Sequence, residues 1–110
     1  MLLPNALRQD FESLLVRPLE KKSSLLARLR QLEDDSLPPQ AQNTIWLAIR
    51  LLSETNFRSS PLYLRLIHSG CQLVLQGNSE WSDLEQCMTY VAHSARRFEL
   101  IREWKKRQSD

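Results

Sequence analysis

Two histidines and two cysteines carry the most obvious chemistry in this chain, because imidazole and thiolate are the usual ligands of zinc. His68 and Cys71 are spaced as neighbours on one helix. Cys87 and His93 are separated by about 120° around a helix, too far to share one ion. The closely spaced ligand pairs of a structural zinc site are missing. We therefore expect no metal site and no cofactor.

The same residues give little support to catalysis. A nucleophilic cysteine needs an electropositive, partly exposed setting and a base close by. Both Cys71 and Cys87 instead lie on or beside apolar stripes, where cysteine usually acts as a small hydrophobic residue. Gly70 and Gly77 stand alone, so there is no glycine-rich phosphate loop. We expect a non-enzymatic protein with no catalytic residues and no small-molecule substrate.

Basic residues near the C-terminus could bind phosphates, with Trp104 available to stack on a base. They are Arg96, Arg97, Arg102, Lys105, Lys106 and Arg107. The competing interpretation is structural: cations complement the dipole at a helix C-terminus, and the preceding glutamates have ion-pair spacing. The net charge of +2 is too small to decide between them. Nucleic-acid binding is therefore the alternative function.

Large side chains at the edges of the apolar stripes form a second candidate surface. Tryptophan and tyrosine are favoured anchors of protein interfaces. The candidate partner-binding residues are Trp46, Trp81, Tyr90, Leu100 and Trp104. The simpler interpretation is that each closes the rim of the core. An exposed patch with two of the tryptophans would favour binding, whereas burial of all three would favour structure.

Composition indicates the fold that must position these residues. The 110 residues correspond to one domain, residues 1–110. Only two are glycine, which leaves few positions for the tight turns of β-hairpins. Leu, Arg, Gln, Glu, Ala and Lys dominate, and these residues favour helices. The sequence predicts an all-α fold.

Five helices are predicted, at about 5–16, 18–34, 39–54, 61–76 and 80–107. Asn5 is the expected N-cap of the first helix, and Pro18 begins the second, although one kinked helix is an alternative. The fourth helix is the most apolar. The segment Ser82–Glu85 matches a capping box for the fifth helix, with a start nearer Ser79 as an alternative.

These helices are expected to form an antiparallel bundle of four to five helices with the 61–76 helix at its centre. The C-terminal helix would be about 38 Å long at 1.5 Å per residue, which exceeds the width of such a domain. Part of that helix is therefore expected to project or to contact a partner.

The leading functional prediction is a protein–protein interaction module, such as a small regulator, adaptor or chaperone-like protein. Its partner would be another protein or a second copy of itself. There is no basic, apolar N-terminal leader, and no window approaches the apolar length of a membrane span. We therefore expect a cytoplasmic protein that does not bind a membrane.

Overall fold

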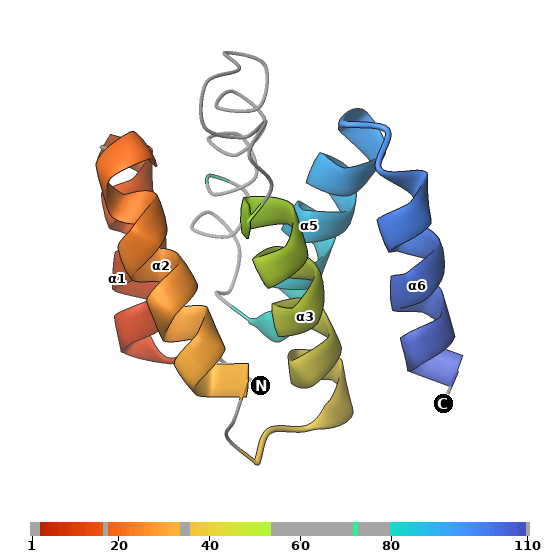
Figure 1. The fold of residues 1–110 in the computed structure, drawn as a ribbon. Coiled ribbons are helices and arrows are strands. Elements are labelled where there is room, and N and C mark those ends of the chain that lie inside the picture. Colours follow the sequence, from red (N-terminus) through yellow and green to blue (C-terminus); the bar gives the residue numbers. More distant parts are fainter. Residues whose placement is uncertain (1–2, 17, 34–35, 54–71, 73–79, 110) are drawn as a thin grey trace.

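The chain folds into helices, as the composition predicts. A computed structural model describes residues 3–16, 18–33, 36–53, 72 and 80–109 (Figure 1). The helices in these ranges are α1 (Asn5–Val16), α2 (Pro18–Glu33), α3 (Pro39–Ser53), α5 (Trp81–Ser94) and α6 (Phe98–Ser109). The radius of gyration is 12.8 Å, as expected for a compact chain of this length. The predicted 61–76 helix lies outside the described residues.

Proline begins two of these helices. Pro18 and Pro39 are the first residues of α2 and α3, where the missing N–H would have no partner within the helix in any case. The bounds of α1 match the prediction, but Asn5 is not its N-cap. The carbonyl of Pro4 accepts the N–H of Arg8 at 3.1 Å, so Pro4 holds the capping position and Asn5 is the first helical residue.

The first two helices are separate and pack side by side. The Arg28 guanidinium donates a hydrogen bond of 2.5 Å from Nε to Asp10 Oδ2. These two residues lie at similar distances along the chain from Pro18, so α2 folds back along α1. The alternative of one kinked helix is therefore wrong.

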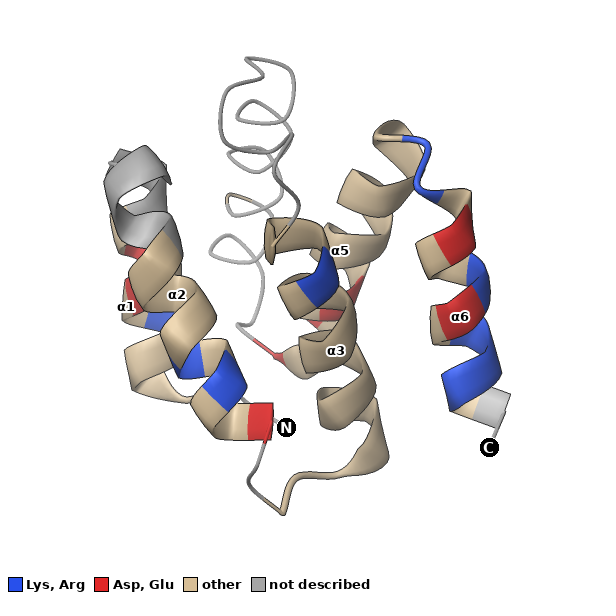
Figure 2. Cartoon of the chain, viewed as in Figure 1, with Lys and Arg blue, Asp and Glu red and all other residues tan. Residues whose placement is uncertain are grey.

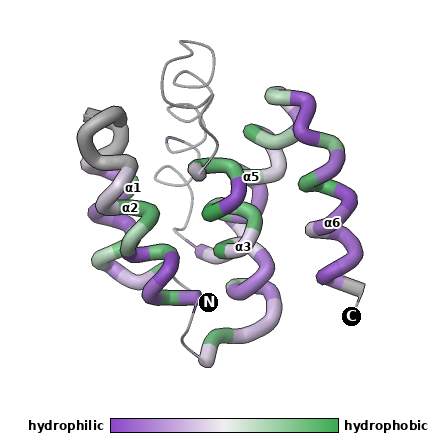
Figure 3. The backbone as a smooth tube through the Cα atoms, viewed as in Figure 1, coloured by the Kyte–Doolittle hydropathy of each residue, from purple (hydrophilic) through white to green (hydrophobic). Residues whose placement is uncertain are grey.

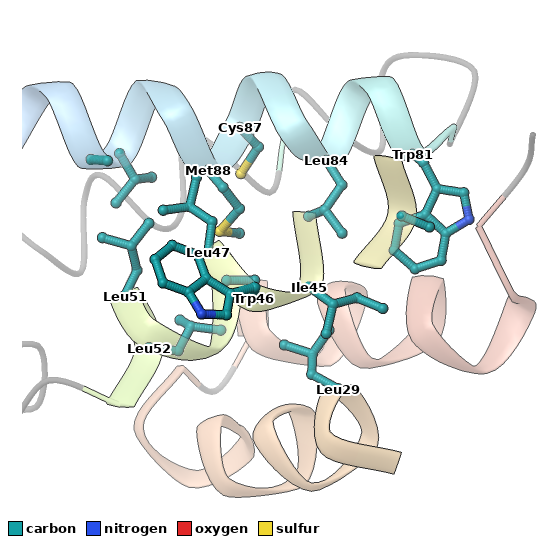
Figure 4. Close-up of a cluster of buried hydrophobic side chains, with 14 of the residues drawn as sticks. Leu29, Ile45, Trp46, Leu47, Leu51, Leu52, Trp81, Leu84, Cys87 and Met88 are labelled. Carbon is teal, nitrogen blue, oxygen red and sulfur yellow. The ribbon is translucent and has the colours of Figure 1, made fainter. Parts of the chain in front are cut away.

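Helix α3 lies at the centre of the described fold, in contact with α2, α5 and α6 (Figure 1). Figure 4 shows its apolar side chains between those of α5 and α2. Its buried residues are Ala41, Asn43, Thr44, Ile45, Trp46, Leu47, Ala48, Leu51 and Leu52. Asn43 and Thr44 are polar residues buried among them. Because α3 has neighbours on three sides, most of its surface is buried and not a single apolar stripe alone.

The predicted long C-terminal helix is wrong, because the chain turns at residues 95–97 between α5 and α6 (Figure 1). The Arg97 N–H donates to the Ala92 carbonyl at 2.8 Å, and the Arg96 N–H donates to the His93 carbonyl at 3.0 Å. This pair of hydrogen bonds is the Schellman motif that ends many helices. Arg96 takes the left-handed position with a φ of 59°, where glycine is usual.

The position of the apolar residues around the helix axis explains this turn. Counted at about 100° per residue, Leu84, Met88 and Val91 fall within about 60° of one another. On a continuous helix, Ile101 and Trp104 would lie about 100° and 160° from Leu84. Ile101 and Trp104 form a second apolar face. The turn directs this face toward the core, where both residues are buried. A straight helix would leave them pointing away from the core.

The N-cap of α5 lies between the two predicted alternatives, Ser82 and a start nearer Ser79. Glu80 is the N-cap, and its N–H donates to Asp83 Oδ2 at 3.0 Å. This is the reciprocal hydrogen bond of a capping box, formed two residues before the predicted Ser82–Glu85 pair. The earlier start makes Trp81 the first residue of α5, and its side chain is buried in the core (Figure 4).

Candidate functional site at the α5–α6 corner

The three tryptophans are buried. Trp46, Trp81 and Trp104 expose 9%, 2% and 8% of their surface, and all belong to the main hydrophobic core. Figure 4 shows Trp46 and Trp81 among buried apolar side chains of α3 and α5. They do not form the exposed patch that would favour partner binding, so their burial favours a structural role.

Trp46 joins α3 to α6. The guanidinium carbon of Arg50, one turn along α3, lies 5.5 Å from the centroid of the Trp46 ring. The guanidinium carbon of Arg107, in the last turn of α6, lies 4.9 Å from the same centroid. Both distances fit cation–π contacts. This indole therefore contacts two cations as well as the core.

Exposed aromatic side chains gather where α5 meets α6. Tyr90 and Phe98 are 44% and 54% exposed, and they are the exposed large hydrophobic residues of the described structure. The rings of His93 and Phe98 meet edge to face, with centroids 6.5 Å apart and an angle of 63°. Tyr90 precedes His93 by three residues, so the two are neighbours on α5. We call Tyr90, His93 and Phe98 the corner surface.

The turn at residues 95–97 creates this surface. On a continuous helix Phe98 would extend the apolar stripe of α5. The Schellman turn instead makes Phe98 the first residue of α6 and sets its ring against His93. The change of apolar phase after Val91 was the signal for this outcome. Leu100, a predicted partner-binding residue, is half-buried and packs against the core.

The predicted basic residues lie along α6 and its preceding turn (Figure 2). Arg96, Arg102, Lys105, Lys106 and Arg107 are exposed, and Arg97 is half-buried. Trp104 is buried, so the aromatic group expected to stack on a base is not on this surface. Phe98 is the exposed aromatic residue of α6. Figure 3 shows that most of α6 is hydrophilic.

Metal ligands and nucleophiles do not gather in the described part of the chain. Within it, no group of three His, Cys, Asp or Glu residues could hold an ion. Cys87 is buried in the hydrophobic core. His68 and Cys71 lie outside the described residues. None of the described helices is both long enough and apolar enough to cross a membrane.

Comparisons with known proteins add no identification. No family model, curated protein or solved structure matches this chain.

Proposed function

We propose that this protein is a non-enzymatic protein–protein interaction module that binds an acidic partner segment at the corner surface. One observation carries the proposal. Tyr90 and Phe98 keep about half of their surface exposed while Trp46, Trp81 and Trp104 are buried. Exposed aromatic rings are favoured anchors at protein interfaces because they bury a large area with few rotatable bonds.

The charges around the corner surface indicate the chemistry of the partner. Arg96 is exposed in the turn itself, and Arg102 lies one helical turn after Phe98. The basic residues of the 96–107 segment outnumber its two carboxylates, Glu99 and Glu103. An acidic partner would be attracted to this segment, and complementary charge raises the rate and specificity of association more than its affinity. The aromatic rings would supply most of the affinity.

The wider functional setting follows from the same proposal. A small regulator, adaptor or chaperone-like protein of the cytoplasm fits a chain that works by binding alone. We also propose that the helices pack as an antiparallel bundle.

The proposal can be tested by truncating the corner surface. Wild type, Phe98→Ser, Tyr90→Ser and the control Gln9→Ser would be used as bait in extracts of the native cell. Gln9 is exposed on α1, so its replacement controls for a generic surface change. We expect a retained protein whose yield falls about fivefold or more with either aromatic variant, since loss of an interface anchor costs about 1 kcal/mol or more. Circular dichroism should show the same helicity in all four proteins.

Two outcomes contradict the proposal. In one, the same proteins are retained in equal yield by wild type and by Phe98→Ser. In the other, no protein is retained by wild type at low salt. If the aromatic variants do lose a partner that wild type retains, that partner should be purified. Its acidic segment should be tested as a peptide by titration calorimetry.

Nucleic-acid binding is the second candidate, supported by exposed Arg102, Lys105 and Lys106. Arg102 is spaced three and four residues from the two lysines, so the three share one side of α6. Binding of this kind should weaken steeply with added salt. Nucleic-acid binding should be lost when Arg102, Lys105 and Lys106 are all replaced by glutamate. It should be retained in Phe98→Ser. The absence of DNA or RNA retention at low salt would remove this candidate.

A further inference from the structure

We infer that residues 95–97 form a hinge at which α5 and α6 straighten, so that α6 of one copy docks on α3 of a second copy. The exchanged surface is the inner face of α6, namely Ile101, Trp104 and Arg107. This self-association does not depend on the proposed function, which uses the outer corner surface. The partner is a second copy of this chain.

The local sequence of the hinge favours a helix. From position 80 to 109 the chain has no glycine and no proline, and Ala95, Arg96 and Arg97 are all good helix formers. Arg96 nevertheless has a φ of 59°, in the left-handed region that disfavours residues with a Cβ. The turn is therefore maintained by the docking of α6 and not by the local preference of its residues. Short strained hinges of this kind favour exchange between copies.

Straightening changes what each side chain can reach. On a continuous helix Phe98 would lie about 40° from Leu84, beside the apolar face of α5. In the bent form Phe98 is 54% exposed, whereas straightening aligns it with that apolar face. Ile101 and Trp104 would then lie about 100° and 160° from Leu84 and could not reach their own core. They would need the core of another copy.

The docking face is already present in the structure. Helix α6 packs against α3 and α5, and its most buried residues are Ile101 and Trp104, exposed by 4% and 8%. Arg107 adds its contact with Trp46 of α3. An exchanged α6 would form these same contacts with α3 of the second copy. Exchange of identical contacts is a low-cost route to a dimer.

Exchange and partner binding would also oppose one another. The edge-to-face contact between His93 and Phe98 exists because α6 turns back beside α5. A straight helix separates these two rings and dismantles the corner surface. A ligand of the corner surface therefore favours the monomer, by linkage between binding and conformation.

The first test is the mass of the protein after refolding from urea over a range of concentrations, measured by light scattering. We expect a dimer whose fraction rises with concentration. Arg96→Gly should raise the dimer dissociation constant about 25-fold, because glycine removes a left-handed penalty of about fivefold per chain. Gln86→Gly is the control: Gln86 is exposed within α5, which is helical in both forms.

The second test shows whether a dimer has exchanged α6. Arg50→Cys and Arg107→Cys are combined with Cys71→Ser and Cys87→Ala and treated with a flexible bismaleimide. The original side chains at 50 and 107 meet at the Trp46 ring. Exchange links two chains covalently, whereas a closed fold links each chain to itself. The inference is supported by linked chains in the dimer fraction and a weaker Arg96→Gly dimer.

Three results would overturn the inference. The first is a refolded wild type that is a monomer up to its solubility limit. The second is a dimer that contains only links within one chain. The third is a dimer of equal strength in wild type and Arg96→Gly, which would show that the hinge does not straighten.

Discussion

The guanidinium carbon of Arg107 lies 4.9 Å from the centroid of the Trp46 ring, so the last turn of α6 is held on the central helix α3. Helix α6 is mostly hydrophilic (Figure 3). Its inner face depends on the buried residues Ile101 and Trp104. Arg107 extends that face by one turn. Arg107, which was predicted to contact nucleic acid, therefore has a structural contact with the Trp46 ring.

Replacing Arg107 tests this contact. Arg107→Ala should lower the free energy of unfolding by about 0.5 to 1 kcal/mol, the usual size of a cation–π contact near the surface. Arg102→Ala removes an exposed arginine from the same helix and is the matched control. Urea unfolding followed by circular dichroism measures both. Equal losses in the two variants would mean that the ring contact contributes nothing specific.

The indole N–H of Trp104 is buried and has no hydrogen-bond acceptor among the residues that the structure describes. An unsatisfied buried donor costs about 1 to 3 kcal/mol. Trp104→Phe removes that donor and should change the free energy of unfolding by less than Trp81→Phe does. Thermal unfolding measures the difference. A larger loss in Trp104→Phe would show that its N–H has an acceptor in solution.

The N-cap of α5 can be located by two substitutions. Asp83→Ala removes the carboxylate that accepts the Glu80 N–H and should cost about 0.5 to 2 kcal/mol of stability, as the loss of a cap does. Ser82→Ala should be nearly neutral, because Ser82 is exposed and helical. Chemical denaturation of both variants decides the question. A larger loss of stability in Ser82→Ala than in Asp83→Ala would identify Ser82 as the cap.

The Asp10–Arg28 ion pair links α1 to α2. Its side chains are 19% and 41% exposed, so solvent screens it only in part. A double-mutant cycle with Asp10→Ala and Arg28→Ala should give a coupling energy of up to about 1 kcal/mol. The coupling should shrink in high salt. The exposed Arg8–Glu12 pair within α1 is the control and should couple more weakly.

The sequence predicted the helices of the N-terminal half because their signals are local. Pro18 and Pro39 begin α2 and α3 whatever the rest of the chain does. The α5–α6 turn was missed because no glycine or proline marks it and Arg96 takes the glycine position. The rotation of the apolar face between Val91 and Ile101 is the signal of this turn in the sequence.

The tryptophans were harder to place, for a different reason. Trp46 lies at the edge of the apolar stripe of α3, and α6 folds back against that edge with Arg107. Burial of this kind depends on a contact between residues far apart in the sequence. The exposure of Tyr90 and Phe98 also depends on the fold, because the turn decides which aromatic rings remain exposed.

The burial of all three tryptophans gives the protein its own optical signal. Trp46 and Trp104 lie where α6 meets α3, whereas Trp81 begins α5 on the far side of the turn. Undocking of α6 would expose the first two indoles to water and shift their fluorescence to longer wavelengths, while Trp81 stayed in an apolar setting. The emission spectrum of the unlabelled protein can therefore report, in real time, whether the last helix is docked.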